Sequence, residues 1–310
     1  MLSFKDLTEE NKESVTKGLS AGLCDPEARE LMEDVASSFY ELIDENGDTG
    51  VAFCVEYGCF LARIFDMGRY IFVYPIPITE GADVFSAVDG VCEYAVRQEV
   101  PLVFSDVPRE EVLTVVSLIR HANIDSEDVE GESFRIEAKS ECSLLSEIPE
   151  YDGGEITLGP EGEEDAEKIA QLACNDEVNR YWGFDYRDDI PEGCVLNSYF
   201  FDESRAEFER GVSMTLAVRY NGEFVGECVL YAFDYKGGAE IAVRIFPEHW
   251  GKKIGTRALR AGIELAKRIG LIRLYTVIDE RNTRSKAMVK GEFDVTRVEG
   301  GLVYYERDLY

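Results

Sequence analysis

The sequence of 310 residues predicts an α+β protein of two domains, each a mixed, mostly antiparallel sheet flanked by helices. Three observations support this prediction. The chain exceeds the usual length of one domain, strand and helix patterns occur without the repeated parallel units of a dinucleotide fold, and both halves show a similar order of elements. The stretch from Ile136 to Gly159 loses its periodicity and reads as a linker. We therefore expect domains at 1–150 and 151–310.

The second half predicts elements in the order βααβββαβαββ. A strand at 155–158 precedes helices at 163–174 and 197–210, and strands at 213–219 and 224–233 follow. Asn221-Gly222 lies between these two strands and supplies the positive φ angles of a tight hairpin. The remaining expected elements are a strand at 240–246, a helix at 256–269, a strand at 272–278, a helix at 283–290 and two closing strands that end at Tyr305.

The first half repeats much of this order. We expect strands at 70–78, 102–104 and 134–136, and helices at 83–98 and 110–121. This similarity favours an architectural duplication. Two independent α+β domains with a similar element order are the alternative.

Composition excludes several classes of function. Apolar residues make up 45% of the chain, which is enough for a sizeable core, and 62 acidic against 32 basic residues give a net charge of −30. Such a field disfavours nucleic acid and anionic membranes as partners. Eight cysteines without a Cys-x-x-Cys pair and two histidines predict no metal site. We find no signal peptide or membrane-length apolar run, so a cytoplasmic protein is expected, as a monomer or homodimer.

Positive charge gathers in one segment. Residues 244–290 hold 12 basic and 4 acidic side chains, a net charge of +8 in an acidic chain. The same segment contains a strand, a loop with Gly251 and Gly255, and a helix. Backbone N–H groups at a helix start have no helical partner, and glycines let an anion approach them. The segment therefore predicts a site for a phosphorylated ligand, although these glycines can also serve an ordinary turn.

Residues 155–309 resemble the GNAT superfamily of acyl-CoA-dependent N-acyltransferases, in particular its ribosomal-protein-alanine acetyltransferase branch. The motif Gln/Arg-x-x-Gly-x-Gly/Ala falls on residues 250–255, where Trp250 replaces Gln/Arg and Lys253 replaces the first glycine. The resemblance implies that acetyl-CoA is the co-substrate. It assigns the cofactor contacts to Val243, Arg244, Ile245, Gly251, Lys252, Lys253, Ile254, Gly255, Thr256 and Asn282.

The resemblance also implies candidate catalytic residues. Ser285 falls where some members protonate the leaving thiolate, whereas Val289 stands where others carry a tyrosine acid. Glu227 and Glu240 are candidates for the base that takes the amine's proton, and an ordinary surface carboxylate is the alternative for each. Tyr181 and Trp182, within the segment 179–184, are similar to residues that line the acceptor side in that branch, and a core aromatic cluster is the alternative.

The first half resembles the C-terminal domain of phosphatidylglycerol lysyltransferases, which is itself acyltransferase-like. Its turn at 79–83 has one glycine and two carboxylates, so we expect no CoA there. Tandem GNAT-like domains follow from the two resemblances. The expected function is direct transfer of an acetyl group to the primary amine of a small molecule or peptide. The alternatives are aminoacyl transfer from charged tRNA and a non-catalytic CoA-binding or interaction protein.

Overall fold

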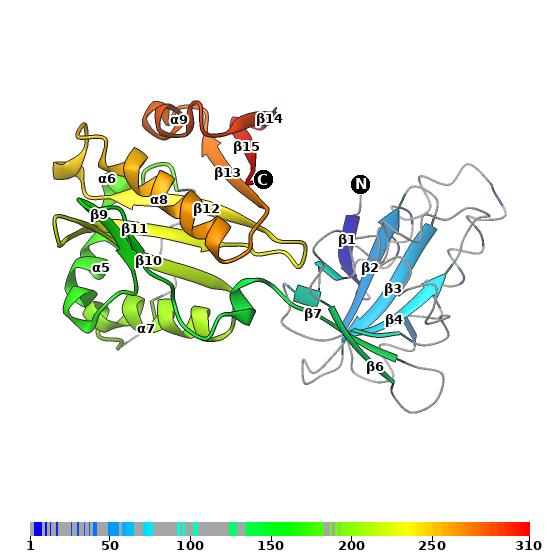
Figure 1. The fold of residues 1–310 in the computed structure, drawn as a ribbon. Helices are drawn as coiled ribbons and strands as arrows, with labels where there is room; N and C mark the ends of the chain where they lie inside the picture. Colours follow the sequence, from blue (N-terminus) through cyan, green and yellow to red (C-terminus); the bar gives the residue numbers. More distant parts are fainter. Residues whose placement is uncertain are drawn as a thin grey trace. The chain divides into compact units, whose positions relative to one another are not determined.

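The computed structural model of the chain divides into two compact units, Met1–Lys139 and Ser140–Tyr310 (Figure 1). In the second unit it describes residues 140–182, 187, 190, 191 and 193–310. In the first unit it describes the strands given below and scattered single positions. No helix among the described residues is long and apolar enough to cross a bilayer.

The first unit contains one seven-stranded sheet in the order β1-β2-β3-β4-β5-β7-β6. Neighbours are antiparallel except for β4 and β5, which run parallel. The predicted strands at 70–78, 102–104 and 134–136 correspond to β4, β5 and β7. The predicted helix at 83–98 is helical at the positions described within it, while the helix at 110–121 and the turn at 79–83 lie outside the described residues. The strands are β1 (Ser3–Leu7), β2 (Thr49–Val55), β3 (Gly58–Ile64), β4 (Ile71–Ile76), β5 (Leu102–Phe104), β6 (Ile124–Asp128) and β7 (Phe134–Ala138).

The second unit contains an eight-stranded sheet in the order β14-β15-β13-β12-β11-β10-β9-β8. Only the step from β12 to β13 is parallel among its pairings. The strands are β8 (Tyr151–Asp152), β9 (Ile156–Gly159), β10 (Ser213–Tyr220), β11 (Glu223–Tyr231), β12 (Gly238–Ile245), β13 (Arg273–Asp279), β14 (Asp294–Glu299) and β15 (Leu302–Asp308). The α-helices are α5 (Ala166–Ala173), α6 (Asp176–Asn179), α7 (Leu196–Glu209), α8 (Ile254–Arg268) and α9 (Thr283–Val289).

These elements confirm the predicted mixed α+β order of the second half, with small shifts at the ends. The β10–β11 hairpin turns at Asn221 and Gly222, whose φ angles are 51° and 84°. Positive φ at both central positions matches the twist of the two strands, which is why Asn-Gly predicted this turn. Sequence analysis missed the short β8 and α6, because two or four residues carry too little periodicity to be recognised.

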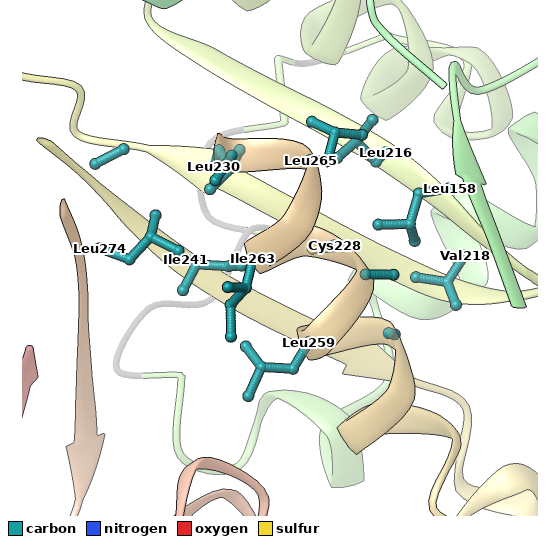
Figure 2. Packing of buried hydrophobic residues seen from close by; sticks show 14 of the residues in the cluster. Leu158, Leu216, Val218, Cys228, Leu230, Ile241, Leu259, Ile263, Leu265 and Leu274 are labelled. Atoms are coloured by element: carbon teal, nitrogen blue, oxygen red, sulfur yellow. The ribbon is translucent and has the colours of Figure 1, made fainter. Parts of the chain in front are cut away.

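Helix α8 covers one face of the sheet and buries the main core (Figure 2). Its inward side chains, Leu259, Ile263 and Leu265, pack with Cys228 and Ile241 of the strands. Gly262 permits this close approach, since a Cβ atom there would lie 2.7 Å from the Cys228 sulfur. This buried apolar face fixes where the start of α8 lies against β12.

Helices α5 and α7 cover the opposite face through a smaller cluster of Ile169, Phe201, Ala217 and Phe224. The segment just after residue 139 differs from the expected linker. Cys142 is fully buried in the main core, and the Ser140 hydroxyl donates to the carbonyl of Gly211 at 3.0 Å. Residues 140–150 thus belong structurally to the second unit, because apolar side chains at Cys142, Leu145 and Ile148 anchor a segment that looks polar in sequence.

Candidate active site

A pocket of about 680 Å³, which we call the donor pocket, opens where β12 separates from β13. The parallel pairing between these strands covers Gly238–Glu240 against Arg273–Tyr275, whereas β12 continues to Ile245. The Phe246 N–H donates to Val225 on the β11 side. The backbone N–H groups of successive residues in a strand point to alternate sides. The N–H of Val243, three residues before Phe246, therefore points away from β11 into the gap. The backbone N–H of Val243 therefore faces the donor pocket.

The start of α8 forms another wall of the donor pocket. Gly251, Lys253, Ile254, Gly255 and Thr256 all line it, and no side chain caps the helix. The first N–H groups of a helix lack intrahelical partners and carry the positive end of its dipole. This arrangement suits a diphosphate. Lys252 is the one predicted cofactor residue that does not line the pocket.

Lys253 occupies the position of the first motif glycine and takes a left-handed conformation, with φ 60° and ψ 16°. The chain therefore keeps the backbone shape that glycine favours, at a steric cost of about 1–2 kcal/mol for a residue with a Cβ atom. Unlike glycine, the lysine also adds a positive charge beside the start of the helix. The departure from the motif changes the side chain and leaves the backbone turn in place.

Cationic side chains surround the donor pocket. They are Arg180, Arg244, Lys253, Arg260, Arg281, Arg284 and Lys290. Some charges counted in the segment 244–290 are nevertheless compensated by residues outside it: Arg257 pairs with Glu155, and Arg260 pairs with Glu292. The net charge of +8 therefore overstates the local field, since Glu155 and Glu292 lie outside the counted segment. His249 also lines the donor pocket.

A second pocket of about 620 Å³, the acceptor pocket, lies on the sheet face that α5 and α7 cover. Its wall from α7 includes Tyr199, Phe200 and Ser204. Its charged lining residues are Arg244 and four carboxylates, Glu161, Glu203, Glu207 and Glu227. The acceptor pocket is therefore acidic where the donor pocket is basic.

Glu227 and Arg244 face each other across β11 and β12 at the base of the acceptor pocket. The Arg244 Nε donates to Glu227 Oε2 at 3.0 Å, and Nη2 donates to the same oxygen. The side chains are only 1% and 9% exposed. The guanidinium also lies over the Trp182 ring, 5.0 Å from its centroid. Glu227 is thus a buried, ion-paired carboxylate with one oxygen, Oε1, that has no hydrogen-bond partner in the described residues.

The two pockets meet at Tyr181, Trp182 and Arg244, which line both. A donor held at the start of α8 and an acceptor held below α7 can therefore approach each other there. The predicted substrate residues Tyr181 and Trp182 both lie at this junction. Gly183 and Phe184, from the same predicted segment, lie outside the described residues.

Comparison with known proteins identifies the domain that contains this junction. Residues 155–291 match the acetyltransferase (GNAT) domain family. The second unit contains a GNAT acetyltransferase domain.

Two bacterial relatives of this GNAT domain share 26% of their residues with it. One is the uncharacterized N-acetyltransferase YoaA of Bacillus subtilis, aligned over 129 residues, 41% of this chain and 72% of the relative. The other is spermidine N(1)-acetyltransferase of Escherichia coli, aligned over 133 residues, 42% of this chain and 67% of the relative.

Similar solved structures include spermidine N-acetyltransferase from Vibrio cholerae in complex with CoA and spermine, at 15% identity, covering 51% of this chain and 97% of that chain with a TM-score of 0.42. Mycobacterium smegmatis RimJ in complex with CoA-disulfide covers 52% of this chain and 86% of that chain, at 18% identity and the same TM-score.

The protein is thus an acetyl-CoA-dependent N-acyltransferase, and acetyl-CoA is its co-substrate. The residues of the GNAT domain fit this donor, because the uncapped start of α8 and seven cationic side chains line one pocket. No group of His, Cys, Asp and Glu side chains that could hold a metal occurs in the described part of the chain.

Two predicted residues of the GNAT domain meet at the start of α9. The Asn282 side chain caps this helix by accepting from the Ser285 N–H at 3.1 Å, which leaves its amide nitrogen as a donor. Both residues line the donor pocket. Val289 is buried in the core, so its position offers no acid to the site.

The two base candidates have different surroundings. Glu227 lines the acceptor pocket, whereas Glu240 lines neither pocket and accepts from the Tyr231 hydroxyl at 2.9 Å. Side chains alternate between the two faces of β12, and Ala239 and Ile241 are buried in the core. Glu240 therefore lies on the sheet face of the acceptor pocket and contacts it through Tyr231.

Sequence analysis missed Glu161 and Ser204. Glu161 lies in the loop between β9 and the short 3₁₀ helix Glu163–Asp165, and Ser204 lies on α7. A single glutamate in a loop rich in Glu and Gly carries no distinguishing pattern. Its one weak signal was its place directly after a strand, where side chains gather at the sheet edge.

Proposed function

We propose that the protein transfers the acetyl group of acetyl-CoA directly to a primary amine of a small polycationic acceptor, with both substrates bound together. The observation that carries the proposal is the junction at Tyr181, Trp182 and Arg244 between a basic and an acidic pocket. A diphosphate and an ammonium group are drawn to opposite sides of this junction. Direct transfer then needs no covalent enzyme intermediate.

The donor side supplies orientation and stabilises developing charge. Amides at the start of α8 and the surrounding cations bind the diphosphate. When bound, acetyl-CoA supplies the acyl group as a thioester. The Val243 N–H faces the gap beside it and can donate to the oxygen that becomes negative during attack. Ser285 lines the donor pocket at the start of α9, and we assign it the role of giving a proton to the departing sulfur.

The acceptor side selects a cationic amine. Four carboxylates against one guanidinium line the acceptor pocket. The relative named spermidine N(1)-acetyltransferase, at 26% identity, supports a polyamine as the acceptor class. The same carboxylates disfavour charged tRNA as a donor, because they repel a polyanion.

The first unit supports the proposal of tandem acyltransferase-like domains. Its sheet order, β1-β2-β3-β4-β5-β7-β6, has its parallel step at the same place as β9-β10-β11-β12-β13-β15-β14 of the second unit. We expect this first domain to bind no CoA. Calorimetry should therefore give one acetyl-CoA per chain, and a second equivalent site would contradict this assignment.

An amine panel tests the function. Thiol release from acetyl-CoA is followed with spermidine, an aminoglycoside, a peptide with a free N-terminus and butylamine as the monocationic control. We expect spermidine to have the highest kcat/KM, at least tenfold above butylamine, with acetylated spermidine identified by mass spectrometry. Equal rates with butylamine would contradict the polycationic acceptor, and no release with any amine would contradict transfer to amines.

A further inference from the structure

The acceptor pocket contains a carboxylate with an unusual set of partners, and its role deepens the function proposed above. The Ser204 hydroxyl donates to Glu161 Oε2 at 2.6 Å. Glu161 Oε1 is sealed from solvent and has no hydrogen-bond partner among the described residues. A buried acceptor oxygen without a donor is costly. The pocket beside it is where a donor from a ligand would enter.

The other carboxylates that line this pocket each have a partner or are open to solvent. Glu227 is paired with Arg244, and Glu207 accepts from the Ser213 hydroxyl. Glu203 lies 3.7 Å from the Arg210 guanidinium and is about half exposed. Within the described part of the chain, neither Glu161 nor Glu207 forms an ion pair, and of these two only Glu161 has a sealed oxygen without a hydrogen-bond partner. Glu161 is therefore the pocket carboxylate that combines an unpartnered oxygen with the lack of a cationic partner.

Charged groups from four elements determine how Glu161 titrates. Burial raises its pKa to about 8, and the negative charges of Glu227 and Asp165 act in the same direction. The hydrogen bond from Ser204 and the charge of Arg244 lower it. The groups around Glu161 are Asp165 before α5, Glu203, Ser204 and Glu207 on α7, Glu227 on β11 and Arg244 on β12. We therefore expect Glu161 to hold a proton in the free protein at pH 7 and to become a carboxylate when a cation enters.

We propose that Glu161 binds the reacting ammonium group of the acceptor and accepts its proton during acetyl transfer, with Ser204 holding the carboxylate in place. The nitrogen loses one proton to Glu161 Oε1 and attacks the thioester carbon. An N–C bond forms while the carbonyl π pair moves to oxygen, and the C–S bond breaks as the carbonyl returns. The sulfur leaves as a thiolate and takes a proton from Ser285 or water, and the second proton of the attacking nitrogen restores that donor. Glu161 keeps the proton that it accepted, as in the free protein at pH 7. The proton released when the amine binds is therefore the net proton of the cycle, beside an amide and CoA.

This role has a consequence that does not require turnover. The free protein at pH 7 holds a proton on Glu161, and the free amine holds one on its ammonium group. In the bound pair one proton is shared between the two, so binding of the amine releases close to one proton. Neither a structural hydrogen bond nor a general acidic surface produces this stoichiometry.

Kinetics test the catalytic part with three variants and spermidine as the probe. Glu161→Gln should lower kcat/KM at pH 8 by about 100-fold or more, which is the usual contribution of a positioned base. Acetyl-CoA affinity should stay within about twofold. Wild-type kcat/KM should rise with pH through an apparent pKa near 8, and Ser204→Ala should move that rise to higher pH. Glu163→Gln is the control, since this exposed carboxylate lies two residues away.

Calorimetry of spermidine binding at pH 7, in buffers of different ionisation enthalpy, counts released protons. We expect close to one proton for wild type and Glu163→Gln, and close to none for Glu161→Gln. No release by the wild type, release that persists in Glu161→Gln, or Glu161→Gln activity within threefold of wild type at every pH would each overturn the proposal. If the wild type acetylates no amine, the proposed function fails, whereas release that depends on Glu161 still supports the ammonium site.

Discussion

The indole Nε1 of Trp250 donates a 2.7 Å hydrogen bond to the backbone carbonyl of Ile245. This contact connects the last residue of β12 to the turn that starts α8. The guanidinium of Arg284 lies over the same ring, 3.6 Å from its centroid, and so connects α9 to that turn. Trp250 therefore holds together three walls of the donor pocket, namely the end of β12, the turn before α8 and the start of α9. This contact gives tryptophan a structural role at the position where the family motif has Gln or Arg.

Replacing Trp250 by phenylalanine removes the hydrogen bond to Ile245 and keeps a ring for Arg284. A neutral hydrogen bond contributes about 0.5–1.5 kcal/mol. We expect acetyl-CoA affinity to fall roughly threefold to tenfold, measured by calorimetry. Tyr310→Phe, which removes the 2.9 Å bond to the Lys267 carbonyl away from both pockets, is the control. Unchanged affinity in Trp250→Phe would show that the brace does not shape the pocket.

Two substitutions at Lys253 distinguish the effect of backbone strain from the effect of its positive charge. Lys253→Gly relieves the left-handed conformation and should raise the free energy of unfolding by about 1 kcal/mol. Lys253→Ala keeps the strain, so its stability should stay near that of the wild type. Both variants lose the positive charge and should bind acetyl-CoA more weakly, with the larger loss at low salt. Urea denaturation and calorimetry distinguish the two effects, and equal stability of both variants would rule out strain at this turn.

Gly255 tests how closely the donor approaches α8. A Cβ atom at this position would lie 3.2 Å from the Met288 sulfur and 3.7 Å from Ile245 Cγ1. Gly255→Val should therefore push side-chain atoms into the wall of the donor pocket. We expect acetyl-CoA to raise the melting temperature of the wild type and to leave that of the variant unchanged. A ligand-induced shift of wild-type size in the folded variant would place the cofactor elsewhere.

The raised pKa of Glu161 should make the stability of the protein depend on pH. Its pKa is raised to about 8 in the folded protein, against an ordinary value near 4.5. The folded state therefore binds more protons between these values, and stability from this group is highest below pH 4.5 and falls as pH rises to 8. Glu161→Gln should melt near the wild-type temperature at pH 5 and above it at pH 9. A variant that is less stable than wild type at pH 9 would contradict the claim that Glu161 is a buried carboxyl group with a raised pKa.

Sequence patterns predicted the second unit well, because most of its elements carry a clear periodicity or a specific turn. Asn221-Gly222 determines the hairpin, and the spacing of Leu259, Ile263 and Ala266 determines which face of α8 is buried. Contacts between distant residues could not be predicted in the same way. The pairs of Arg257 with Glu155 and of Arg244 with Glu227 depend on strand pairing and helix packing, which no local pattern specifies.

The acceptor pocket shows the same limit at a functional site. Glu227 could be suspected from its strand, whereas Glu161 becomes notable only when α7 brings Ser204 against it. Its raised pKa depends on burial and on the charge of a residue 66 positions later in the chain. Site residues that belong to a sequence motif could therefore be predicted. Site residues that only tertiary packing brings together, such as Glu161 and Ser204, could not.

The central claim is that acetyl-CoA lies at the start of α8 with its thioester at the junction with the acidic pocket. A crystal structure with CoA and spermidine tests it most directly. We predict the diphosphate within hydrogen-bond distance of the Gly255 and Thr256 amides, and a spermidine nitrogen beside Glu161. A diphosphate bound away from residues 251–256, or spermidine bound outside the pocket between α7 and the sheet, would contradict the account.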